Sequence, residues 1–157
     1  MMRSKWLLVA MPILCLFGAA PVPEQKGEDL LALDSKWTGT LNQKGKIDAL
    51  EVELKLEIEF KVTKRDGNKF EAELKEWNDG GIKLTYLVKG EIVKAKEGKG
   101  HAVSFKSYDF KDAESQTFIN IPYTGKLEGK KLAGTWKHPQ NDDGITIEGD
   151  FTLELSK

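Results

Sequence analysis

The amino-acid sequence predicts an all-β fold, an antiparallel eight- or nine-stranded barrel or barrel-like sandwich, after an N-terminal signal segment. Three observations support this prediction. Apolar and charged residues alternate strictly over long stretches, turn-forming residues separate these stretches at regular intervals, and no helical period follows the first 20 residues. The chain of 157 residues has room for one domain. We expect a signal peptide at 1–20, a linker at 21–34 and the β-barrel domain at 35–157.

The N-terminal segment has the pattern of a secretory signal. Arg3 and Lys5 precede an apolar run over 6–17, and small residues follow it. This run is shorter than the roughly 20 residues that span a bilayer, so we expect an exported protein, periplasmic or extracellular. Pro21 fits poorly beside a cleavage site, so an uncleaved signal segment is the alternative. In that case this segment would be the only part of the protein in contact with a membrane. The only cysteine, Cys15, lies inside this segment, so we expect no disulfide in the barrel.

The clearest strand runs from Leu50 to Val62, where seven apolar residues alternate with six charged ones. A strand places all residues of one parity on one face, whereas a helix would scatter them around its axis. The apolar positions Leu54, Leu56, Ile58 and Phe60 are therefore expected to face the core. The intervening positions Glu53, Lys55, Glu57 and Glu59 are expected to face solvent.

Turn signals such as Asp66-Gly67-Asn68 and the Asn-Asp-Gly-Gly run at 78–81 separate the other predicted strands. These strands are Lys36–Leu41, Phe70–Trp77, Ile82–Val88, Glu91–Ala95 (a continuation or a new strand), His101–Tyr108, Thr117–Thr124, Lys131–Lys137 and Ile145–Leu155. A short helical turn is expected at Leu30–Leu33.

Glycine and tryptophan lie close together near both ends of the predicted barrel, in Trp37-Thr-Gly-Thr40 and in Gly134-Thr-Trp136. With these motifs, the region from Ser35 to Lys157 resembles the lipocalin-like or calycin-like small exported barrels of bacteria. The resemblance implies that the last strand closes onto the first. We therefore expect Lys36–Leu41 to pair with one of the last strands, with Trp37 and Trp136 facing the interior at this seam.

The residues form no recognisable catalytic or metal-binding pattern. His101 and His138 are far apart and no cysteine follows the signal, so the spacing of a zinc site is absent from the sequence. Asp142-Asp143-Gly144 is typical of a turn and lacks the spacing of a calcium loop. Ser104 and Ser107 lie near His101 without the glycines of a nucleophile elbow. We expect no metal and no cofactor, and the net charge of −1 with mixed signs does not favour a nucleic-acid partner.

Aromatic residues are the remaining candidates for a binding site, and they are Trp37, Trp77, Tyr86, Tyr123 and Trp136. Such rings either line a ligand pocket or fill the interior of a small barrel.

The sequence favours a non-catalytic exported binding module for a small apolar ligand or for another exported protein. One alternative is an enzyme with an unrecognised carboxylate-based site, because paired carboxylates occur at Glu51, Glu53, Glu57 and Glu59. The other alternative is an eight-stranded outer-membrane barrel, whose size the chain matches.

Overall fold

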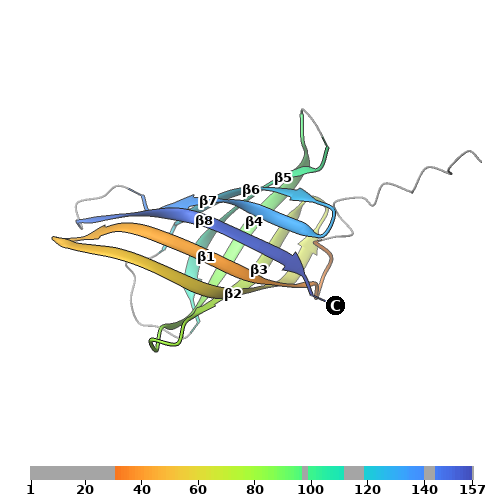
Figure 1. Ribbon diagram of the computed structural model, residues 1–157. Coiled ribbons are helices and arrows are strands. Elements are labelled where there is room, and N and C mark those ends of the chain that lie inside the picture. Colours follow the sequence, from red (N-terminus) through yellow and green to blue (C-terminus); the bar gives the residue numbers. More distant parts are fainter. Residues whose placement is uncertain (1–30, 97–98, 112–118, 140–143, 157) are drawn as a thin grey trace, which may run out of the picture.

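The structure, a computed structural model, describes residues 31–96, 99–111, 119–139 and 144–156. Eight antiparallel strands form a closed barrel in which each strand pairs with its sequence neighbours and β8 returns to β1 (Figure 1). The strands are β1 (Lys36–Ile47), β2 (Leu50–Asp66), β3 (Lys69–Trp77), β4 (Lys83–Lys94), β5 (His101–Phe110), β6 (Pro122–Glu128), β7 (Lys131–Lys137) and β8 (Ile145–Leu155). The described residues include no helix that is long and apolar enough to cross a membrane. The predicted antiparallel barrel is confirmed.

Most strands begin and end near the predicted residues, and β7 and β8 have the predicted bounds. The segment from Glu91 continues β4 and does not form a new strand. β1 was expected to end at Leu41 but continues to Ile47. β6 was expected at Thr117–Thr124 but begins at Pro122 and ends at Glu128. Asn120 has a φ of 65°, a left-handed conformation that interrupts extended backbone just before this strand. Residues 117 and 118 of that prediction lie outside the described residues.

The seam between β1 and β8 closes the barrel along all of β1 except its first residue, from Trp37 opposite Leu155 to Ile47 opposite Ile145. Gly39 permits the close approach of the two strands, since a Cβ atom there would lie only 1.9 Å from the backbone oxygen of Thr152. The predicted seam is confirmed.

The two faces of β2 divide as the alternation predicts. Leu56, Ile58 and Phe60 are buried, whereas Leu54 is only half-buried because it lies where β2 extends beyond β3. On the outer face Glu53, Lys55 and Glu57 are exposed. Glu59 is the least exposed of this row because its carboxylate forms ion pairs with Lys36 at 2.6 Å and Lys75 at 3.2 Å.

The packed part of the chain begins before β1. Leu31, which lies in the expected linker and in the expected helical turn, is fully buried in the core. A turn follows it, closed by the N–H of Ser35 donating to the carbonyl of Ala32 at 3.0 Å. Asp34 then donates its N–H to the carbonyl of Val62, which ties this segment to β2 just beyond the residues that pair with β1.

Candidate functional site

Aromatic rings fill the middle of the barrel. Phe105 on β5 lies at the centre of this cluster, with its ring 5.3 Å from that of Phe60 and 5.8 Å from that of Phe151. It stacks on Tyr123 at 4.7 Å with an interplanar angle of 6°. Aromatic pairs at these distances add to the stability that burial provides. The rings therefore belong to the hydrophobic core and fill the interior of the barrel.

Four of the five aromatic residues singled out from the sequence face this interior. Trp37, Tyr86, Tyr123 and Trp136 have relative exposures of 0%, 3%, 2% and 6%. The structure brings Tyr123 and Trp136 together, with ring centroids 6.0 Å apart. Trp37 lies apart from them and donates its indole N–H to Ser35 Oγ at 3.3 Å. The expectation that Trp37 and Trp136 both face the interior is confirmed.

Trp77 is the exception, and its expected place in the interior is corrected. It lies on the outer face at 38% exposure, because Phe70, Ala72 and Leu74 of β3 face the core and Trp77 has the opposite parity. The same alternation turns Glu76 inward, where it is 5% exposed. The sequence contained this signal, since an inward Phe70 and an inward Trp77 are incompatible on one regular strand.

Glu76 is a buried acid between two tyrosines. It lies diagonally across β3 and β4 from Tyr86, and the two side chains are hydrogen-bonded. Burial raises the pKa of the Glu76 carboxyl from 4.5 to about 7, and the hydrogen bond from Tyr86 offsets part of this rise. Burial and the nearby Glu76 charge raise the pKa values of both Tyr86 and Tyr123. The carboxyl is therefore partly protonated at neutral pH and both phenols remain neutral.

Trp136 adds a further polar atom to the interior. Its indole N–H is buried and finds no hydrogen-bond partner among the described residues. A buried donor left without a partner costs about 1–3 kcal/mol. This nitrogen lies against the backbone of β8, since a Cβ atom on Gly149 would be 3.0 Å from it.

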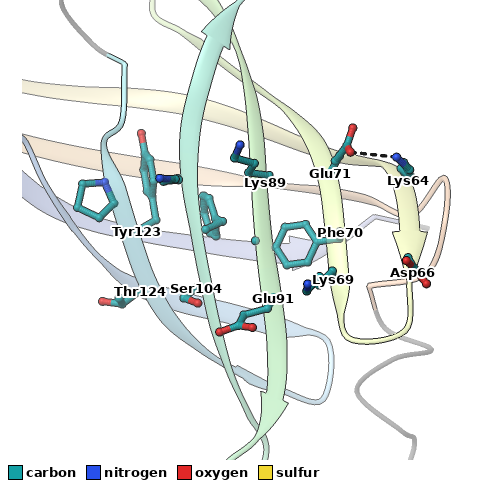
Figure 2. A pocket seen from close by; sticks show the side chains of 14 residues that line it. Lys64, Asp66, Lys69, Phe70, Glu71, Lys89, Glu91, Ser104, Tyr123 and Thr124 are labelled. Carbon is teal, nitrogen blue, oxygen red and sulfur yellow. Dashed lines mark hydrogen bonds and ion pairs between the residues drawn. The ribbon is translucent and has the colours of Figure 1, made fainter.

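A groove of about 530 Å³ crosses the outer wall from the end of β2 over β3, β4 and β5 to β6, and we call it the wall groove (Figure 2). One side of it is a row of outward residues that lie opposite one another on successive strands. This row, which we call the lysine row, consists of Lys64, Glu71, Lys89, Lys106 and Pro122. The other side is a polar row made of Lys69, Glu91, Ser104 and Thr124.

The floor of the wall groove is the row of residues between these two sides, Phe70, Gly90, Phe105 and Tyr123. Gly90 is required in this row, because a Cβ atom there would lie 2.2 Å from the carbonyl oxygen of Ser104 and 2.5 Å from the Cβ of Phe105. The aromatic core therefore lies directly beneath a stretch of wall that carries no side chain at Gly90.

The charges on the lysine row are unevenly paired. Lys64 is bound to Glu71 at 3.2 Å (Figure 2), which leaves Lys89 and Lys106 directly opposite each other on β4 and β5. Lys89 lies 5.1 Å from the centre of the Tyr108 ring, and neither lysine forms an ion pair with a described residue. Like charges directly opposite on neighbouring strands repel each other. An anion bound between the two ammonium groups would remove this repulsion.

Sequence reasoning missed the wall groove. Ser104, considered with His101 as a catalytic pair, is instead one of the lining residues of the groove. In the described parts of the chain no group of three or more His, Cys, Asp or Glu side chains is placed to hold a metal ion. Asp142 and Asp143 lie outside the described residues.

No protein-family model matches this chain, and no curated protein matches it.

Proposed function

We propose that this protein is a non-catalytic binding module whose ligand occupies the wall groove. The ligand is a small molecule with an apolar body and one acidic group. The observation that carries the proposal is the lining of the groove, in which Lys89 and Lys106 face each other beside an aromatic floor. Its volume of about 530 Å³ falls within the range typical of ligand sites, roughly 300–1,000 Å³, as do the volumes of other hollows on the described surface.

The wall groove supports this function better than the barrel interior does. The interior side chains from Phe60, Phe105, Tyr123 and Phe151 contact one another and occupy the centre of the barrel. A ligand inside would have to displace these rings, which costs packing energy. The groove needs no such rearrangement.

The chemistry of the ligand follows from the lining residues. The stems of Lys89 and Lys106 offer apolar surface to the ligand body, while their ammonium groups attract an acid. Ser104 and Thr124 on the opposite side supply hydroxyl groups that donate or accept hydrogen bonds.

A pair of fluorescent probes tests the proposal. 8-Anilinonaphthalene-1-sulfonate carries an aromatic body and an anion, and N-phenyl-1-naphthylamine is its neutral counterpart. We expect the sulfonate to bind at one site per chain and more tightly than the neutral probe. The variant Lys89→Glu/Lys106→Glu should weaken sulfonate binding at least about tenfold, or about 1.4 kcal/mol, and leave the neutral probe nearly unaffected.

A matched control reverses two lysines outside the groove, Lys83 and Lys131, both of which are exposed on strands. The variant Lys83→Glu/Lys131→Glu changes the net charge equally and should bind the sulfonate as the wild type does. Equal losses in the two double variants would show that only net charge matters and would contradict a site at the groove.

Export belongs to the same proposal. The basic and apolar residues of 1–20, which lie outside the described residues, support a secretory signal. We expect the protein to be recovered from the periplasm or the medium of expressing bacteria. Mass spectrometry of that protein would give its N-terminus, and retention of the whole chain in the cytosol would contradict export.

A carboxylate-based enzyme is the second candidate, and Glu76 is the observation that favours it. A general acid or base works best with a pKa near the working pH, and that of Glu76 is about 7. Its side chain is buried, however, and a substrate would need a path into the barrel. Loss of a measured hydrolytic activity in Glu76→Gln, with the fold retained, would favour this candidate over the binding module.

The outer-membrane alternative receives less support. A barrel that spans a membrane turns an apolar surface toward lipid. Here the outer face of β2 carries Glu53, Lys55, Glu57 and Lys61 as exposed residues, while the apolar residues face the core. Solubility of the purified protein without detergent is the expected result.

A further inference from the structure

Part of β2 in the barrel wall has a neighbouring strand on one side only. β1 pairs with β2 from Ile47 opposite Leu50 onward, but β3 pairs with β2 only from Glu57 to Asp66. Within the described residues, Leu50–Leu56 therefore forms an open edge, which we call the β2 edge. Figure 1 shows it on the ribbon of β8, β1 and β2 that projects beyond the other strands.

The backbone groups that point away from β1 on this edge can be identified. Val62 donates its N–H to Ser35 and accepts the N–H of Asp34, both on the β1 side and both at 3.0 Å. The pairing of β1 with β2 is uninterrupted, so the even-numbered residues of β2 turn their N–H and C=O toward β1. The odd-numbered residues Glu51, Glu53 and Lys55 therefore turn theirs to the open side.

The side chains of the β2 edge are also incompletely covered. Leu50 is 73% exposed, and Val52 and Leu54 are half-buried. Glu53 and Lys55 form no ion pair with any described residue, and Glu51 has only a loose one with Lys46 at 3.8 Å. An edge with unpaired backbone groups and exposed apolar side chains is a template for another strand.

We infer that two copies of this chain associate by antiparallel pairing of their β2 edges. A two-fold axis at Glu53 places Leu50 opposite the partner's Leu56 and Val52 opposite the partner's Leu54. It also places Glu51 opposite the partner's Lys55, twice by symmetry. This register uses the whole open edge and stops where β3 begins to cover β2, at Glu57.

The edge is self-complementary, as a two-fold interface between identical chains must be. Apolar residues lie opposite apolar residues on the inner face, and two opposite-charge pairs form on the outer face. One mismatch remains at the axis, where Glu53 lies opposite the partner's Glu53. The pairing therefore predicts that removing this charge strengthens the dimer, a result that a nonspecific contact would not give.

Sedimentation velocity of the full-length gene product, as purified from expressing cells, tests the inference across a range of concentrations. The wild type should show a concentration-dependent monomer–dimer equilibrium. Glu53→Gln should lower the dimer dissociation constant about threefold or more. Lys55→Glu should raise it at least tenfold, and adding Glu51→Lys to Lys55→Glu should restore it.

Glu53→Pro removes the backbone donor that faces the open side while leaving the hydrogen bonds to β1 in place. It should abolish the dimer without lowering the thermal unfolding temperature of the dilute monomer by more than a few degrees. Lys131→Glu is the control, because this exposed lysine lies on β7, between β6 and β8. A wild type that stays monomeric at all concentrations overturns the inference. So does a dimer that Lys55→Glu and Glu53→Pro leave intact, which would place the interface elsewhere.

Discussion

Glu76→Gln removes one ionisable group from the barrel interior and keeps the size of the side chain. In the folded protein burial raises the pKa of Glu76 from 4.5 to about 7, so the native state holds this proton to a higher pH than the unfolded chain does. The raised pKa of Glu76 therefore adds to the free energy of unfolding. This contribution is complete below pH 4.5, declines as the pH rises and is lost above about 7. At about 1.4 kcal/mol for each pKa unit, the loss amounts to about 3 kcal/mol.

Urea unfolding followed by circular dichroism at several values between pH 4.5 and 8 measures this effect. The free energy of unfolding of the wild type should fall by about 3 kcal/mol relative to Glu76→Gln across this range. The control is Glu57→Gln, an exposed position on β2, and its curve should run parallel to that of the wild type. If the free energy of unfolding of Glu76→Gln followed the same pH dependence as that of the wild type, the raised pKa of buried Glu76 would be refuted.

Three further predictions concern packing and closure. Phe60→Ala should lower the free energy of unfolding in urea by about 3–5 kcal/mol. Glu57→Gln should change it by no more than about 0.5 kcal/mol. Equal effects would contradict the assignment of Phe60 to the inner face of β2 and of Glu57 to its outer face. Deletion from Ile145 onward removes β8 and reopens the seam, so the domain should lose its cooperative thermal transition, and a melt close to that of the full chain would be incompatible with closure. In the chain without 1–20, acrylamide should quench the fluorescence of Trp77 but not that of the buried Trp37 and Trp136. Trp77→Phe should therefore remove the quenchable fraction.

Period-two patterning accounts for most of the fold that could be predicted. In β2 the facing of Leu56, Ile58 and Phe60 follows from alternation alone, because a slip of one residue would bury a row of charge. The bounds of β7 and β8 follow in the same way. β6 was misplaced because its start depends on the left-handed conformation of Asn120, which alternation does not report.

The candidate sites were less accessible to prediction. Glu76 could have been found by applying the alternation of β3 to its last residues, but the size of Trp77 suggested a core position instead. The wall groove could not have been found, since Lys89 and Lys106 become neighbours only through the register of β4 and β5. This register is set by the connection between the two strands, since it runs unbroken from Lys94 opposite His101 to Val88 opposite Ser107.

Most of the strands and the inward face of β2 could be predicted from the amino-acid sequence, because a two-residue period and turn-forming residues act locally. The seam with Trp37 and Trp136 was predicted from the resemblance to small exported barrels. The three-dimensional structure was needed to find that aromatic rings occupy the barrel interior, that Glu76 is enclosed with Tyr86 and Tyr123, and that β2 extends beyond β3. These features depend on register and on the distance across a closed sheet. Both result from many contacts between segments far apart in the chain, so no single stretch of sequence determines them.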